Sequence, residues 1–217
     1  MIVKFDEYRS VLCLHGNLPD HKFFQKIQLP IIAADGAANS LTAMGITPHM
    51  IIGDLDSVRQ DLLVDGKFIK LGDQNSSDFE KALNYLGDNS LLPSIILGIN
   101  GGYMDHILNN INIFARTNSI FLGENMVGLM LRGTHVFNLE IGTKLSLFGI
   151  PKCLITTKGL RWNLGMAELA FPGFNSCFNR TTLGNIHIHI AHGTALLIVY
   201  TSTIVDAGLS LDDDSPG

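Results

Sequence analysis

Five short, unbroken apolar runs dominate the first half of the chain, and they constrain its fold most strongly. They lie at 11–16, 31–36, 50–57, 68–73 and 94–100. Runs without alternation are typical of strands that are buried on both faces. Helical apolar patterns at 76–86 and 105–116 lie between or after these runs, and Ser77 and Glu80 form a capping box for the first of them. This alternation predicts an α/β N-terminal domain with a mainly parallel sheet.

The pattern changes after about residue 120. Short strand-like segments then follow one another, separated by glycines and polar turns, and none has a helical pattern. We therefore predict an all-β C-terminal sandwich domain, with an α/β domain at 1–125 and the sandwich at 126–217. His187 and His189 alternate with isoleucines, which is typical of the solvent-facing side of a strand rather than of a metal-binding pair.

Composition narrows the possible partners. The net charge is −5 and no run of lysine and arginine occurs, so we expect no nucleic-acid partner. No apolar run approaches the roughly 18 residues of a membrane helix, and charged residues interrupt the first segment, so we expect neither a membrane span nor a signal peptide. The three cysteines are far apart and fit no zinc or redox spacing, which favours a reducing cytoplasm.

Aspartates stand at the carboxyl ends of successive predicted strands, where the chain turns into the next element. They are Asp35, Asp54, Asp56, Asp73, Asp78 and Asp105. The carboxyl ends of parallel strands share one edge of the sheet, and clustered carboxylates repel one another unless a cation lies between them. A helix cap explains Asp35 or Asp73 alone, but capping needs one acid rather than two that flank a leucine. The pattern predicts a Mg²⁺ site that also binds substrate phosphates.

A glycine pair, Gly101 and Gly102, stands between a predicted strand and a predicted helix. Glycines at this place let backbone N–H groups approach phosphate oxygens, although a plain tight turn explains them equally well. The segment is neither a Walker A loop nor a full G-x-G-x-x-G motif. If a nucleotide binds here, a metal ion must carry much of the phosphate recognition.

Four segments occur together in the order and approximate spacing of one enzyme family: GDLDS, DQNSSDFEKAL, LGINGGYMDHILNN and TTKGLRWNL. Over roughly residues 11 to 200 the chain resembles the thiamine pyrophosphokinases. The resemblance implies transfer of pyrophosphate from ATP to the hydroxyl of thiamine, which gives thiamine diphosphate and AMP. It implies an ATP- and Mg²⁺-binding first domain, a thiamine-binding second domain, and a homodimer whose sites lie between the first domain of one subunit and the second domain of the other.

The resemblance also assigns roles to individual residues. It implies the metal ligands Asp54, Asp56 and Asp78, which with Asp105 are the predicted catalytic residues. It implies that Gln74 binds ATP. The positions of Asp35, Gly101, Gly102 and His106 add them to the predicted ATP-binding residues, although a surface histidine in a first helical turn explains His106 equally well. The predicted thiamine-binding residues are Trp162, Ser176 and Asn179. Two positions depart from the family pattern: Tyr103 replaces the usual arginine after the glycines, and Phe178 replaces the usual serine before the later asparagine.

The chemistry leaves some choices open. Either Asp78 or Asp105 could accept the alcohol proton, and Arg132 or Arg161 could replace the cation missing at Tyr103. Trp162, the only tryptophan, offers a face for stacking and cation–π contact with thiamine, and its alternative role is a core residue. Alternative functions are a pyrophosphokinase for another alcohol such as a hydroxymethylpterin, a non-catalytic nucleotide- or thiamine-binding regulator, and a metal-dependent phosphohydrolase.

Overall fold

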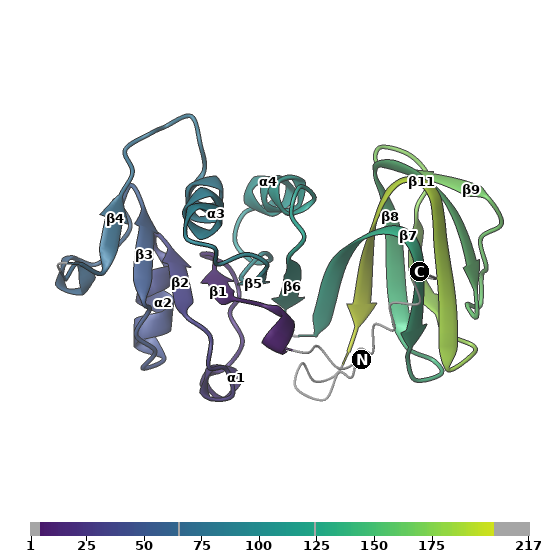
Figure 1. The fold of residues 1–217 in the computed structure, drawn as a ribbon, viewed down its shortest axis with the longest axis horizontal. Coiled ribbons are helices and arrows are strands. Elements are labelled where there is room, and N and C mark those ends of the chain that lie inside the picture. Colours follow the sequence, from purple (N-terminus) through teal and green to yellow (C-terminus); the bar gives the residue numbers. More distant parts are fainter. Residues whose placement is uncertain (1–4, 65, 124, 202–217) are drawn as a thin grey trace. The chain divides into compact units, whose positions relative to one another are not determined.

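The computed structural model describes residues 5–64, 66–123 and 125–201, which form two compact units on either side of residue 124. We call residues 5–123 the first unit and residues 125–201 the second unit. Strands and helices alternate in the first, whereas no helix occurs among the described residues of the second (Figure 1). The predicted fold class, a mainly parallel α/β domain followed by an antiparallel β domain, is confirmed.

The first unit is built on a six-stranded parallel sheet in the order β6-β5-β1-β2-β3-β4. Its strands are β1 (Ser10–Cys13), β2 (Ile31–Ala34), β3 (Met50–Gly53), β4 (Phe68–Lys70), β5 (Ser94–Leu97) and β6 (Ile120–Gly123). All five predicted strands are present, and β6 adds a sixth. Every residue of β1, β2, β5 and β6 is buried, as expected of unbroken apolar runs.

The helical elements of the first unit are η1 (Phe5–Glu7), α1 (His21–Gln25), α2 (Ala37–Ala43), η2 (Gln60–Leu62), α3 (Asp78–Asp88) and α4 (Met104–Phe114). The predicted capping box starts α3: the Ser77 hydroxyl accepts the Glu80 N–H at 3.3 Å, and the Glu80 carboxylate accepts the Ser77 N–H at 3.1 Å. The buried face of α3 packs on β2 and β3, which places the first turn of this helix beside the ends of those strands.

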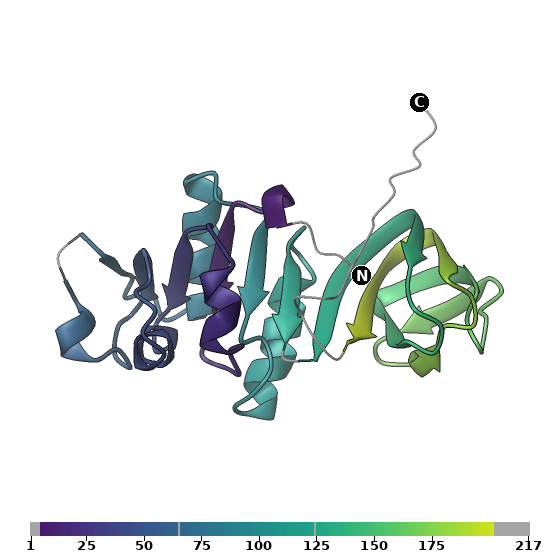
Figure 2. The ribbon, with the colours of Figure 1, turned by 90° about the horizontal axis from the view of Figure 1, so that it is seen from below.

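The second unit consists of five antiparallel strands: β7 (Met126–Asn138), β8 (Lys144–Lys158), β9 (Ala167–Ala170), β10 (Ser176–Arg180) and β11 (Asn185–Tyr200). Their order is β10-β8-β11-β7, and β9 pairs with β8. Figure 2 shows that β7 and β11 are long and bend sharply, so the sheet curves over on itself. His187 and His189 are exposed on β11, between buried isoleucines, as predicted.

The expectation of many short strands in this unit was wrong, because glycines bend the strands without ending them. Gly133 in β7 and Gly193 in β11 have φ of +75° and +83°, a backbone conformation that favours glycine. The β7–β11 register shifts between Ile190 and Ala195, as in a β-bulge. The segments on either side of these positions therefore belong to the same strands.

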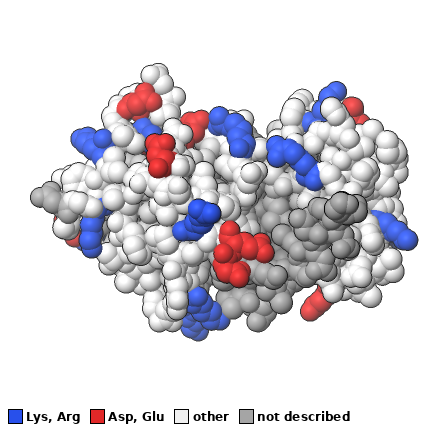
Figure 3. Space-filling model, viewed as in Figure 1, with Lys and Arg blue, Asp and Glu red and all other residues white. Residues whose placement is uncertain are grey.

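Acidic and basic residues are interspersed on the face shown in Figure 3. Among the described residues, no helix is long and apolar enough to cross a membrane.

Candidate functional site

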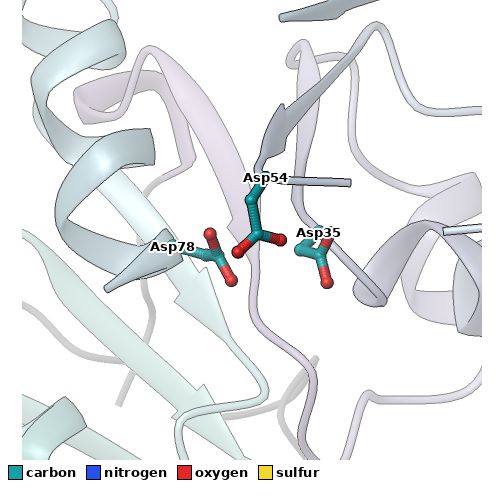
Figure 4. Close-up of side chains that lie close together, drawn as sticks. All are labelled: Asp35, Asp54 and Asp78. Atoms are coloured by element: carbon teal, nitrogen blue, oxygen red, sulfur yellow. The ribbon is translucent and has the colours of Figure 1, made fainter. Parts of the chain in front are cut away.

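The carboxyl ends of β2 and β3 bring three aspartates together in the first unit. Asp35 directly follows β2, Asp54 directly follows β3, and Asp78 is the first residue of α3. One carboxylate oxygen from each residue lies within 4.8 Å of the other two. Figure 4 shows Asp54 between Asp35 and Asp78. We call these three residues the acidic cluster.

Glycine at the end of β3 permits this close approach. A Cβ atom on Gly53 would lie 2.9 Å from the Asp35 Cβ and 3.1 Å from the Asp78 Oδ1. Beyond it, the chain turns sharply at Leu55, which has a φ of +64°. The Asp56 N–H donates to the Asp54 Oδ1 at 3.3 Å across this turn, and this bond orients the Asp54 carboxylate.

Asp35 is the most unusual member of the acidic cluster. The residue is only 6% exposed, and its Oδ1 has no hydrogen-bond partner among the described residues. Burial raises the pKa of Asp35 most strongly; the negative charges of Asp78 and Asp54 also raise it, against hydrogen bonds from Gly36 and Ser57 that lower it. A buried carboxylate oxygen without a donor, beside two other carboxylates, is a site that a cation would satisfy.

Asp54 has the opposite electrostatics. The hydrogen bond from the Asp56 N–H lowers its pKa most, and the Gln74 amide, 3.4 Å from the Asp54 Oδ2, lowers it further. The positive charge of Lys81 acts in the same direction. Gln74 was a predicted ATP-binding residue, and the structure brings it beside the acidic cluster.

Lys81 was not among the predicted site residues. It lies one turn after Asp78 in α3, and its Nζ is 3.1 Å from the Asp78 Oδ1. Its side chain is only 5% exposed. The i, i+3 spacing in DFEK was the available signal, but the same spacing occurs in many solvated helices.

The acidic cluster fits a hard divalent cation. All three side chains offer carboxylate oxygens, the ligands that Mg²⁺ takes, and the set contains no sulfur or imidazole ligand that would favour zinc. The unpartnered oxygen of Asp35 supplies the independent indication that a ligand is expected here.

Two predicted catalytic aspartates lie outside the acidic cluster. Asp56 is exposed, and its carboxylate accepts a hydrogen bond from the Ser57 hydroxyl at 2.9 Å. Asp105 is exposed in the first turn of α4, where its Oδ1 accepts the N–H of His106 at 2.9 Å. The structure does not bring either carboxylate within the 4.8 Å grouping of the other three.

The glycine pair before α4 forms a left-handed turn, with φ of +98° at Gly101 and +73° at Gly102. A Cβ on Gly101 would lie 2.4 Å from the Asn17 Oδ1, so this loop packs closely on the loop after β1. A Cβ on Gly102 would meet open space. His106 is exposed, and its ring lies 6.0 Å from that of Tyr103.

The predicted thiamine-binding residues meet in the second unit. The Asn179 side chain accepts the backbone N–H of Trp162 at 3.2 Å and donates to the backbone carbonyl of Trp162 at 2.8 Å and to the Ser176 hydroxyl at 3.1 Å. Asn179 and Ser176 are buried, whereas Trp162 is 55% exposed, so Trp162 is not a core residue. The Arg161 guanidinium lies 5.0 Å from the centre of the Trp162 ring.

Phe178 lies at a bulge in β10, between Ser176 and Asn179. Its φ is +52°, and its exposed ring stacks on Tyr200 with the ring centres 5.3 Å apart. The aromatic residue that replaces the family's usual serine is therefore exposed and packs against the last residue of β11, which is not the strand that β10 pairs with.

The fold and the site together define a class of protein: a parallel α/β domain with a cluster of carboxylates at the carboxyl edge of its sheet, followed by an antiparallel β domain with an exposed tryptophan. Residues 21–122 match the family described as thiamin pyrophosphokinase, catalytic domain. This match and the relatives below confirm the resemblance inferred from the sequence motifs.

Relatives with similar sequences carry the same name. Thiamine pyrophosphokinase 1 of Arabidopsis thaliana is 28% identical, over 78% of this chain and 70% of its own length. Thiamine pyrophosphokinase 3 of Oryza sativa subsp. japonica is 32% identical, over 61% of this chain and 58% of its own length.

Solved structures share the fold. Yeast thiamin pyrophosphokinase aligns with a TM-score of 0.76 and 19% identity, over 93% of this chain and 90% of its own. Thiamine pyrophosphokinase from Bacillus subtilis aligns with a TM-score of 0.73 and 18% identity, over 89% of this chain and 99% of its own. At these identities the likeness establishes the fold alone.

Proposed function

We propose that this chain is a thiamine pyrophosphokinase, which transfers pyrophosphate from ATP to the hydroxyl of thiamine and yields thiamine diphosphate and AMP. The observation that carries the proposal is the acidic cluster, with its buried and unpartnered Asp35 oxygen, inside the segment that matches the family. Such transfer needs aligned substrates and neutralised phosphate charge more than covalent catalysis, and a carboxylate-held cation suits both needs.

Asp35, Asp54 and Asp78 would hold Mg²⁺, which supplies charge neutralisation for the phosphates when it is bound. Asp35, predicted as an ATP-binding residue, joins the metal ligands in this proposal. Asp56 stays a predicted ligand whose carboxylate would have to rotate away from Ser57 to reach the site.

The phosphates of ATP would lie between the acidic cluster and the loop before α4. Gln74 already hydrogen-bonds to Asp54, and the left-handed turn at Gly101 and Gly102 leads into the N-terminus of α4, whose first backbone N–H groups would face the phosphates. His106, in the first turn of α4, stays a predicted phosphate contact. Arg132 or Arg161 would supply the cation that Tyr103 lacks.

In the reaction, the thiamine hydroxyl oxygen forms a bond to the β-phosphorus of ATP, and the bond from that phosphorus to the AMP oxygen breaks. The alcohol proton passes to a carboxylate, either Asp78 or Asp105. Asp78 shares one oxygen with Lys81, and its other oxygen is available. Asp105 is exposed and accepts only a local backbone bond among the interactions described.

Trp162 would stack on the thiamine ring, whose permanent positive charge favours an aromatic face. Its exposure leaves room for this contact, while Asn179 and Ser176 hold its loop in place. The proposal includes a homodimer, in which the second unit of one subunit completes the site of the other, and a cytoplasmic location. Three free cysteines, of which two are buried, are compatible with a reducing compartment.

The test is an assay with ATP, Mg²⁺ and thiamine that follows AMP and thiamine diphosphate. Equal amounts of both products support the proposal. Asp54→Asn and Asp56→Asn should each abolish turnover with an unchanged circular dichroism spectrum, whereas Asp88→Asn, an exposed aspartate at the end of α3, should not. Normal turnover in both site variants would remove those residues from the mechanism.

Other products would identify a different function. Release of phosphate or pyrophosphate without thiamine would identify a hydrolase, and binding without products would identify a regulator. Turnover with a hydroxymethylpterin but not with thiamine would identify a pyrophosphokinase for a different alcohol.

A further inference from the structure

A buried ammonium group stands at the edge of the acidic cluster. Lys81 and Asp35 are the only charged residues that are buried among those the structure describes. The Lys81 Nζ lies 3.1 Å from the Asp78 Oδ1, and the two residues are one turn apart on α3. A lysine that is 5% exposed has given up most of its hydration, which is costly unless a nearby negative charge compensates for it.

The acidic cluster supplies that compensation, and in return Lys81 supplies the cluster's positive charge. Three carboxylates have oxygens within 4.8 Å of one another, and Lys81 is the one basic residue with a described ion pair to any of them. Without a cation, three such carboxylates would repel one another and separate. The lysine therefore does part of what a bound metal ion would do.

The position of Lys81 also orients Asp78. One Asp78 oxygen receives the ammonium group, which limits rotation of the carboxylate and leaves the second oxygen available as a ligand. That oriented oxygen, Oδ1, lies beside Gly53, where any side chain would come within 3.1 Å of it. Backbone and lysine together thus hold Asp78 near Asp54.

We propose that Lys81 is a positioning residue of the cation site: it is a built-in counter-ion that holds the acidic cluster together without metal and weakens divalent-cation binding by its own charge. The inference rests on the proposed cation site. It predicts two opposite effects: loss of the lysine should lower the thermal stability of the metal-free protein and raise its affinity for the divalent cation.

The experiment compares Lys81→Met, Lys81→Arg and, as a matched control, Lys67→Met, which changes an exposed lysine of the same unit. Mn²⁺ serves as the probe, and its binding is followed by the loss of the free-ion paramagnetic resonance signal. Thermal unfolding is measured in EDTA and in saturating Mn²⁺. Circular dichroism in Mn²⁺ verifies that each variant is folded.

For Lys81→Met we expect Mn²⁺ to bind on the order of tenfold more tightly, because a neighbouring positive charge is gone. In EDTA its unfolding midpoint should fall by about 5 °C, and saturating Mn²⁺ should remove most of that difference. Lys81→Arg should restore both properties toward those of the unmodified protein, and Lys67→Met should change neither.

A purely structural ion pair would lower the midpoint equally with and without Mn²⁺ and leave Mn²⁺ affinity unchanged, and that result would overturn the inference. Weaker Mn²⁺ binding in Lys81→Met would overturn it as well. The failure of the proposed function looks different: the unmodified protein would bind Mn²⁺ but form no thiamine diphosphate, and the comparison of the lysine variants would still stand.

Discussion

Replacing Asp35 with asparagine should stabilise the metal-free protein and at the same time abolish its response to divalent cations. Asparagine has nearly the same shape as aspartate but no charge, and its amide can donate a hydrogen bond to Asp54 or Asp78. The substitution therefore removes the repulsion within the acidic cluster and one of its three cation ligands. Stability and cation binding should change in opposite directions.

The burial of Asp35 sets the size of the stabilisation that we expect from Asp35→Asn. The residue is 6% exposed and its Oδ1 has no partner among the described residues, so its charge carries a desolvation cost that asparagine avoids. Replacing this unpartnered charged oxygen with an amide that donates a hydrogen bond is worth about 1–2 kcal/mol. For a chain of 217 residues this corresponds to a rise of about 2–8 °C in the unfolding midpoint in EDTA.

The effect should depend on pH in a defined direction. Burial raises the pKa of Asp35 above its usual value of about 3.9, so the folded protein holds this proton more tightly than the unfolded chain. The stability that this proton contributes is present below the usual pKa and is lost as pH rises through the raised value. The advantage of Asp35→Asn should therefore appear as pH increases from about 4 and become constant above the folded pKa.

The assay is thermal unfolding in EDTA and in Mg²⁺, with Asp88→Asn as the control. In the unmodified protein, Mg²⁺ at a hundred times its dissociation constant should stabilise the fold by about 2.7 kcal/mol, which raises the midpoint by about 5–11 °C. Asp35→Asn should show little of this rise. A variant that is less stable than the unmodified protein in EDTA, or that keeps the full Mg²⁺ response, would refute the reasoning.

Three further predictions concern the glycine, the tryptophan and the helix start. Gly53→Ala should weaken Mn²⁺ binding by about tenfold or more, because a Cβ 2.9 Å from the Asp35 Cβ must push the carboxylates apart. The circular dichroism spectrum should be unchanged, and equal Mn²⁺ affinity in the variant would contradict the prediction. Trp162→Ala should raise the KM for thiamine about tenfold and change kcat less, and an unchanged KM would remove Trp162 from the site. In the unmodified protein, thiamine should quench the fluorescence of this single tryptophan. Glu80→Gln should cost about 0.5–1 kcal/mol of unfolding free energy at pH 7 and almost nothing at pH 3. The hydrogen bonds from Arg116 and from the helix cap lower the pKa of Glu80, so the stability that the carboxylate contributes is lost as pH falls. Denaturant unfolding at both pH values measures this, and equal losses would contradict it.

The strands of the first unit could be predicted because each is an apolar run long enough to show burial on both faces. Helices α1 and α2 were not predicted, since at five and seven residues they contain too few turns for a helical period to appear. In the second unit the glycines were interpreted as the ends of strands. Whether a glycine ends a strand or bends it depends on the neighbouring strand, and a single sequence does not contain that information.

The acidic cluster also combines features that could be predicted from the sequence with features that could not. The positions of Asp35, Asp54 and Asp78 after strands and at a helix start were visible in the sequence, and so was the resemblance to the family that residues 21–122 match. Lys81 was missed, because its importance comes from burial beside Asp78 and not from its spacing. Asp56 and Asp105 have equally suggestive positions, yet their side chains lie outside the group.

By itself the sequence determined the two kinds of domain and the edge of the sheet at which the acids gather, since apolar runs and the alternation of strands with helices are local patterns that can be followed along the chain. Only the tertiary structure decided which carboxylates share a site, because that depends on distances of a few ångströms between elements far apart in the chain. The packing of α3 on β2 and β3, with Gly53 between them, sets those distances.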